Sequence, residues 1–153
     1  MWIPPETVDP VLFHAPTRKS VAVFGAVCPG DGRLVTLQEK TFNAESFQVF
    51  LQLLLRHARP GRKMMVIADN ARWHHAALLK PWLFRYRHRL HLDFLPSYSP
   101  DFNPIERVWK LTRRLCTHNK YFPALEDLIA AVSERFNMWQ KPNPVLHQLC
   151  AII

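Results

Sequence analysis

Two acidic residues stand where a carboxylate can take part in chemistry. Asp69 ends an apolar run that begins at Met64, and Glu106 follows a proline-rich loop at the start of an expected helix. A carboxylate at the carboxyl end of a buried strand reaches the crevice where α/β proteins bind ligands. Magnesium prefers oxygen ligands, and two metal ions about 3.5–4 Å apart promote phosphodiester chemistry. The settings of the two residues therefore suit metal ligation.

Glu106 also has a simpler interpretation as a helix-capping residue. Asn103 is a good N-cap, Pro104 suits the first helical position, and Glu106 falls at the third position, where a capping-box carboxylate stands. The local pattern alone leaves both interpretations open.

The elements that must position these residues alternate between strands and helices. Residues 1–20 carry four prolines and indicate an extended lead-in. A hairpin follows, then a helix capped by Asn43, an apolar strand expected to be covered on both faces, and a helix with Leu78 on its buried side, interrupted by Pro81. The expected strands are 21–27, 33–40, 63–69 and 90–95; the helices are 44–56, 74–88, 103–118 and 124–139; the tail 141–153 is irregular. We expect one domain over 1–153, an α/β mixed sheet with helices around it.

Composition narrows the function classes. The chain has 153 residues, a formal net charge of +8 and 48% hydrophobic residues, which suits a folded domain with a polyanionic partner, nucleic acid before membrane. No signal peptide or membrane-spanning run is found. Its three scattered cysteines fit reduced thiols in a cytoplasm.

Two ordered motifs give the most specific signal. One is D-N-x3-H, from Asp69 to His74, and the other is L-P-x-Y-S-P-x-x-N-P-I-E-x-x-W, from Leu95 to Trp109. Together they closely resemble the catalytic domain of DDE transposases, in the bacterial insertion-sequence branch of the mariner superfamily. The resemblance is strongest over 63–120 and weaker but collinear from residue 21.

This resemblance implies a ribonuclease-H-like fold and metal-dependent DNA cleavage and strand transfer of a mobile element. It makes Asp69 the second acidic residue and Glu106 the third, at a two-metal site for Mg²⁺ or Mn²⁺. The implied partners are transposon ends and target DNA, and the implied location is the nucleoid in a bacterial cytoplasm.

One family feature is not found. The family's first aspartate would stand on a strand before residues 21–27, and Asp9, beside Pro10 in a loop-like stretch, is a weak replacement. We therefore expect a fold that lacks its first, central strand, as in a fragment, half of a frameshifted gene or a decayed copy. The exposed strand edges would favour a homodimer or pairing with a missing N-terminal segment. Such a chain would be inactive alone.

Several polar residues near the carboxylates have open roles. His74 either orients a phosphate, a water or Asp69, or is a plain helix-start histidine. Asn70 either holds the Asp69 carboxylate or a metal-bound water, or forms a turn. Ser97, Tyr98 and Ser99 either touch the DNA backbone or shape the loop.

Basic residues follow Glu106 with no acid among them. They are Arg107, Lys110, Arg113, Arg114 and Lys120. These residues form either a phosphate-binding face of the helix or a face that is merely solvated. Further basic patches lie at 56–63 and 85–89, and the sequence does not choose between them. The alternative functions are a non-catalytic DNA-binding or assembly remnant of a transposase and a stand-alone ribonuclease-H-like nuclease.

Overall fold

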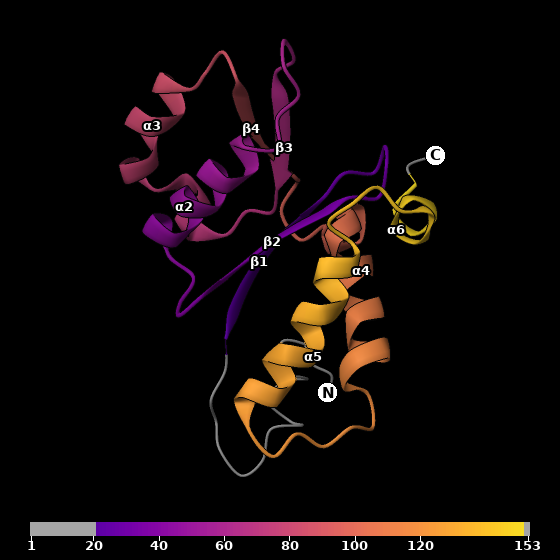
Figure 1. Ribbon diagram of the computed structural model, residues 1–153. Helices are drawn as coiled ribbons and strands as arrows, with labels where there is room; N and C mark the ends of the chain where they lie inside the picture. The colour runs from indigo at the N-terminus through magenta and orange to yellow at the C-terminus, as the bar shows by residue number, and fades with distance from the viewer. Residues whose placement is uncertain (1–20, 152–153) are drawn as a thin grey trace. The chain divides into compact units, whose positions relative to one another are not determined.

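The computed structural model describes residues 21–151, which belong to two compact units (Figure 1). The central unit comprises Ala22–Phe24 and Thr36–Asn103, and the helical unit comprises Gly25–Val35 and the chain from Pro104 onward. The expected lead-in at 1–20, and Asp9 within it, lie outside the described residues.

The β-hairpin that was expected near the start is present and contributes to both units. Strand β1 spans Ala22–Val27 and β2 spans Leu34–Glu39. In the turn between them, the Asp31 carboxylate accepts from the Arg33 amide at 3.0 Å and from its guanidinium at 2.9 Å. Gly32 has a φ of +78°, and a Cβ there would meet the backbone of Asn143 and His147, so this position requires glycine.

In the central unit, helix α2 (Ala44–Leu55) begins as the sequence predicted. The Asn43 side chain accepts from the Ser46 amide at 2.8 Å, and Ser46 Oγ accepts from the Asn43 amide at 3.0 Å, so two amides of the first turn are satisfied. The apolar stripe of α2 is buried, and Phe24 of β1 stacks on its Phe50 with ring centroids 5.5 Å apart.

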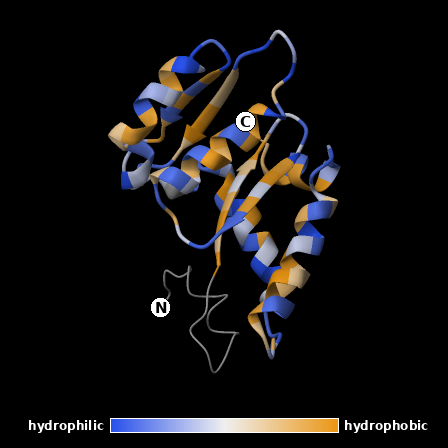
Figure 2. Ribbon diagram, turned by 60° about the vertical axis from the view of Figure 1, so that its left-hand side comes forward, coloured by the Kyte–Doolittle hydropathy of each residue, from blue (hydrophilic) through white to orange (hydrophobic). Residues whose placement is uncertain are grey.

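Strand β3 (Met64–Ala68) pairs in parallel with β4 (Leu90–Phe94), with Met64 opposite Leu90 and Ala68 opposite Phe94. The expectation that β3 is covered on both faces was wrong, because Met65 is 63% exposed and Ile67 56% exposed. Figure 2 colours β3 as apolar, although one of its faces is uncovered. Within the described chain the four strands form two separate two-stranded sheets, β1–β2 and β3–β4.

The single helix expected over 74–88 was also wrong. The chain forms two 3₁₀ turns, Arg72–His75 and Ala77–Leu79, followed by a short helix α3 (Lys80–Arg85). Ala76 is extended, with φ −62° and ψ 139°, and Pro81 lies in the first turn of α3, where its missing N–H costs nothing. In this conformation the Leu78 side chain is 54% exposed and the Leu79 side chain is completely buried.

The helical unit contains α4 (Pro104–Thr112), a π-helical turn (Arg113–Thr117) and α5 (Leu125–Met138). Trp109 of α4 packs edge-on against Phe136 of α5, with centroids 5.8 Å apart, and its ring lies directly against Gly25 of β1. Trp109 is thus a packing anchor for α4. No helix among residues 21–151 is long and apolar enough to cross a membrane.

The tail expected to be irregular instead contains helix α6 (Pro144–Leu149). Asn143 caps it by accepting from the Leu146 amide at 2.8 Å, and its Nδ2 donates to the Gly32 carbonyl at 2.8 Å. The prolines of this tail are compatible with the helix because Pro144 occupies its first turn.

Candidate active site

Asp69 follows the last residue of β3 and presents a carboxylate at the carboxyl end of the sheet. The Asp69 side chain is 61% exposed, although its backbone is bonded into the fold. Oδ1 receives the His74 ring nitrogen at 3.1 Å and the Ala71 amide at 3.2 Å. The hydrogen bond from His74 lowers the pKa of Asp69, and it outweighs the opposing effect of burial. Asp69 is therefore held as a carboxylate at neutral pH.

His74 is buried, and Nδ1 lies 2.8 Å from the Asp69 carbonyl oxygen as well as 3.1 Å from Oδ1. Both oxygens are acceptors, so Nδ1 must carry the proton that it shares between them. The imidazole packs on the Phe47 ring at 4.2 Å and edge-on to Trp73 at 5.7 Å. Of the roles left open by the sequence, the contact with Asp69 is the one that the geometry supports.

Asn70 connects β3 to the loop that follows β4. Its Nδ2 donates to the Leu95 carbonyl at 2.7 Å and lies 3.4 Å from Ser97 Oγ. Its Oδ1 lies 2.9 Å from Nε2 of His75, which must donate that bond. The amide therefore fixes the start of the Leu95–Trp109 motif next to Asp69 and does not contact the Asp69 carboxylate.

Sequence reasoning missed His75 because only His74 fits the motif spacing. The His75 ring packs on Phe94 with centroids 4.0 Å apart, and its Nε2 orients the Asn70 amide. A second imidazole directly beside the first was the available signal. The pair Asn70–His75 thus supports the loop, while His74 supports the carboxylate.

Tyr98 occupies an unusual position within this loop. Its φ is +58°, a left-handed conformation that costs a non-glycine residue of order 1 kcal/mol, and its side chain is fully exposed. Ser99 Oγ donates to the Ser97 carbonyl at 3.3 Å, as turn formation requires. The loop therefore presents an aromatic ring to solvent close to the Asn70 anchor.

Glu106 stands in the first turn of α4, in the helical unit, and is half-buried. Ile105 and Val108 beside it are buried, which fixes the face of α4 that carries Glu106. The guanidinium of Arg107, the next residue of α4, donates to the Leu149 carbonyl at the end of α6 at 3.2 Å. The Cys150 thiol is buried against the Pro104 carbonyl, and burial raises the pKa of Cys150.

The donor chemistry of Asp69 fits a hard divalent cation. Its oxygens are ionised and exposed, and no hydrogen bond within residues 21–151 is made by Oδ2. The Glu106 carboxylate is the same kind of donor. Over the described part of the chain, no three or more histidine, cysteine, aspartate or glutamate side chains are gathered as a metal-binding group.

The basic residues after Glu106 are arranged unequally. Lys110 and Arg114 are exposed, Arg113 is half-buried at the start of the π turn, and Arg107 is bonded to the end of α6. The Lys120 ammonium donates to the Leu115 carbonyl at 3.2 Å. Lys110 and Arg114 therefore present the most accessible positive charge on this segment.

The sequence and fold match known proteins along most of the chain. A family model described as DDE superfamily endonuclease matches residues 1–129. The uncharacterized protein y4pE/y4sA of Sinorhizobium fredii is 31% identical over 115 residues, 75% of this chain and 82% of that protein. The Tcb2 transposase of Caenorhabditis briggsae is 37% identical over 78 residues, 47% of this chain and 28% of the transposase.

Solved structures share the fold at low sequence identity. The catalytic domain of Mos1 mariner transposase superposes with a TM-score of 0.63 at 20% identity, over 85% of this chain and 67% of that one. The Mos1 strand transfer complex gives a TM-score of 0.61 at 20% identity, over 88% of this chain and 40% of that one. The expected ribonuclease-H-like fold is thereby confirmed. The chain spans 28% of the Tcb2 transposase and 40% of the chain in the Mos1 strand transfer complex.

Proposed function

This chain belongs to the DDE superfamily endonucleases, and we propose that it is a transposase catalytic domain whose metal-binding carboxylates are Asp69 and Glu106. Its reaction is the cleavage and strand transfer of DNA at the ends of a mobile element. Divalent metal dependence is general in this family, and we propose Mg²⁺ or Mn²⁺ as the ions of a two-metal site.

The observation that carries the proposal is the environment of Asp69. The carboxylate stands at the end of a strand, His74 holds it ionised, and the Asn70 amide joins it to the loop that leads to Glu106. The Asp69 side chain is 61% exposed, so the carboxylate is accessible to a metal ion. Asn70 thus joins the two motifs of the sequence directly beside Asp69.

Bound divalent ions neutralise charge on the scissile phosphate and lower the pKa of the attacking water. The residues of this chain orient that chemistry. Asp69 and Glu106 hold the ions, His74 keeps Asp69 in one rotamer and one protonation state, and Asn70 keeps the loop with Ser97 and Tyr98 beside it.

DNA binding follows from the family, and we propose that transposon ends and target DNA are the ligands. Lys110, Arg113 and Arg114 supply positive charge beyond Glu106, where phosphates would run. A chain of net charge +8 that binds DNA should be found with the nucleoid of a bacterial cytoplasm.

We further propose that the chain forms a homodimer. Within residues 21–151, β3 pairs on one edge alone, with β4, and exposes Met65 and Ile67 on one face. An unpaired edge beside apolar side chains favours pairing with another strand. Sedimentation of the wild-type chain should give a dimer that Ile67→Lys shifts toward monomer, whereas Val145→Lys, at an exposed valine of α6, should leave it unchanged. A monomeric wild type would exclude the dimer.

The purified chain by itself should not carry out strand transfer. The proposed site has two carboxylates, Asp69 and Glu106, and two carboxylates alone would hold the second ion of the site weakly. Robust Mg²⁺-dependent cleavage of terminal-repeat DNA that is lost in Asp69→Ala would contradict this expectation.

Metal binding tests the proposed site without requiring turnover. Titration with Mn²⁺, followed by the electron paramagnetic resonance of the free ion, should show at least about tenfold weaker binding in Asp69→Asn and in Glu106→Gln. Glu126→Gln, at an exposed position in the first turn of α5, should bind as the wild type does. Wild-type affinity in both site variants would refute the assignment.

A further inference from the structure

The parallel pairing of β3 and β4 brings together two basic segments that lie far apart in the sequence. The strands are in register from Met64 opposite Leu90, so the residues that precede each strand meet at the amino end of the sheet. The Met64 amide donates to the Arg89 carbonyl at 2.8 Å, and the Arg89 guanidinium reaches the Leu55 carbonyl at the end of α2 at 3.5 Å. The segments 56–63 and 85–89 therefore form one surface, which we call the basic end.

The basic end is strongly and uniformly positive. Its seven cationic side chains are all exposed and come with no carboxylate in either segment: Arg56, Arg59, Arg62, Lys63, Arg85, Arg87 and Arg89. The acidic residues of the chain between positions 56 and 94 are Asp69 and Asp93, which lie toward the opposite end of β3 and β4. Such a concentration of positive charge favours a polyanion around it.

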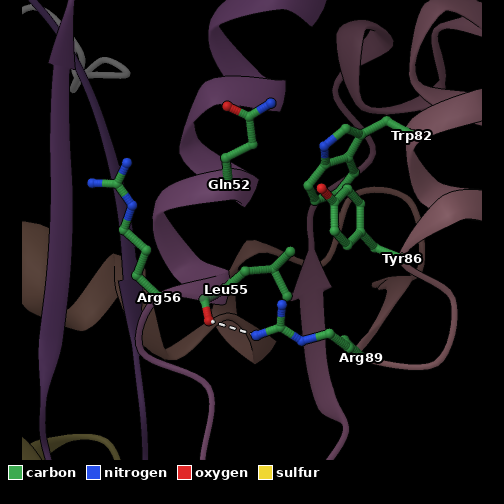
Figure 3. A pocket seen from close by; sticks show the side chains of 6 residues that line it. All are labelled: Gln52, Leu55, Arg56, Trp82, Tyr86 and Arg89. Atoms are coloured by element: carbon green, nitrogen blue, oxygen red, sulfur yellow. Dashed lines mark hydrogen bonds between the residues drawn. The ribbon is translucent and has the colours of Figure 1, made fainter.

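Aromatic rings give the basic end a fixed shape. Trp82 and Tyr86 pack with centroids 4.8 Å apart and line a hollow of about 210 Å³ together with Gln52, Leu55, Arg56 and Arg89. Figure 3 shows the two rings on one side of the hollow and Arg56 on the other. The Arg87 guanidinium lies 4.0 Å from the centre of the Phe84 ring and donates to the Phe84 carbonyl at 2.7 Å. Guanidinium groups held in this way lose less entropy when they bind phosphate.

The basic end is well separated from the candidate active site. Five residues of β3 lie between Lys63 and Asp69, and a strand rises about 3.3 Å per residue, so the two ends are roughly 20 Å apart. A phosphate bound at one end cannot also occupy the other. Duplex DNA has a persistence length of about 150 base pairs, so it stays nearly straight over roughly 20 Å. One duplex can therefore place one phosphate at the basic end and another near Asp69.

We propose that the basic end is a second DNA-contact surface, which binds the phosphate backbone of duplex DNA through residues other than Asp69 and the cations of α4. The inference rests on the proposed function only for its class of ligand. The contacts are ionic and directed at phosphates, so they contribute affinity and position without reading sequence.

Salt-dependent binding of the full chain to a random-sequence duplex, followed by fluorescence anisotropy, tests this surface. Arg56→Gln with Arg89→Gln should flatten the plot of log affinity against log salt by about two units, since each phosphate contact contributes about 0.9. Arg56→Lys with Arg89→Lys keeps the charge and should keep most of the slope. Lys40→Gln with Lys141→Gln removes equal charge from exposed positions elsewhere and should leave the slope unchanged.

Arg89 also contacts Leu55, so a second variant guards against misfolding. Arg62→Gln with Lys63→Gln lies in an exposed turn next to Gly61, where an added Cβ meets nothing within 4 Å, and it should flatten the slope similarly. An unchanged slope in both charge-removing variants would overturn the proposal. The proposal would also be overturned if the charge-removing variants kept their DNA binding but lost binding to poly-glutamate. The basic end would then bind an acidic protein. Neither result tests whether Asp69 is a metal ligand. A failure of that assignment would appear in the Mn²⁺ titration alone.

Discussion

Nδ1 of His74 lies 2.8 Å from the carbonyl oxygen and 3.1 Å from the carboxylate Oδ1 of the same residue, Asp69. One proton is therefore shared between the backbone and the side chain of the residue that ends β3. This arrangement fixes the direction of the carboxylate through Oδ1 and leaves the side chain 61% exposed. It also couples the charge of Asp69 to the stability of the central unit.

Replacing His74 by phenylalanine should raise the pKa of Asp69 toward its ordinary value, because the hydrogen bond from His74 is the largest cause of the lowering. A lowered folded-state pKa means that ionised Asp69 stabilises the fold above its unfolded pKa, and that this contribution is lost as pH falls through the folded pKa. The variant should therefore lose less stability on acidification than the wild type. Carbon-13 NMR of the Asp69 carboxyl gives the pKa directly.

His75→Phe is the matched control for this titration. His75 bonds to Asn70 and does not contact the Asp69 carboxylate, so the pKa of Asp69 should stay lowered in that variant. Equal shifts in the two variants would mean that the general aromatic packing, and not the bond from His74, sets the ionisation of Asp69.

Gly25→Ala should lower the free energy of unfolding by about 1–3 kcal/mol, because an added Cβ would overlap the Trp109 ring in a packed core. Gly30→Ala is the control, since its Cβ would come no closer than 3.8 Å to Cys28 Sγ. Urea denaturation of the two variants compares them. Equal stability would show that Trp109 moves freely and is not the anchor of α4.

Asn143→Ala should cost about 1–2 kcal/mol of stability, because it removes the cap of α6 and the bond to the Gly32 carbonyl. Asn137→Ala, at an exposed position within α5, should change stability by less than about 0.5 kcal/mol. Thermal unfolding followed by circular dichroism checks both. A neutral Asn143→Ala would mean that α6 does not depend on its cap.

Sequence signals located most elements here because their causes are local. The Asn43 cap and the Asn103-Pro104 start each predicted a helix that the structure contains. Asn143-Pro144 carries the same signature, yet the surrounding prolines concealed α6. The Asn-Pro capping signature is therefore valid for this short helix as well.

The errors came from features that depend on tertiary packing. Every residue from Met64 to Ala68 is apolar, so no alternation could show that one face of β3 is uncovered. The 3₁₀ turn Arg72–His75 places His74 against Asp69, and the chain is extended at Ala76 directly after it, which no helical periodicity reveals. The basic end likewise exists because β3 and β4 are parallel and in register.

Arg113→Ala with Arg114→Ala should flatten the salt dependence of DNA binding by up to about two units and weaken all duplexes alike. These residues lie at the π turn that follows α4, beyond Glu106. Anisotropy titrations at several salt concentrations measure the slope, with Lys141→Ala as an exposed control. Unchanged affinity and slope would place the DNA on another surface, and the basic end would then be the better candidate.

Iron-mediated cleavage tests most directly whether Asp69 and Glu106 hold one metal centre. Fe²⁺ in place of Mg²⁺, with ascorbate and peroxide, generates radicals that cut the polypeptide close to the bound ion. We predict cuts near residue 69 and near residue 106, both suppressed by excess Mg²⁺ and both lost in Asp69→Asn and in Glu106→Gln. Cuts at one position alone, or a cut at 106 that survives Asp69→Asn, would contradict a shared centre.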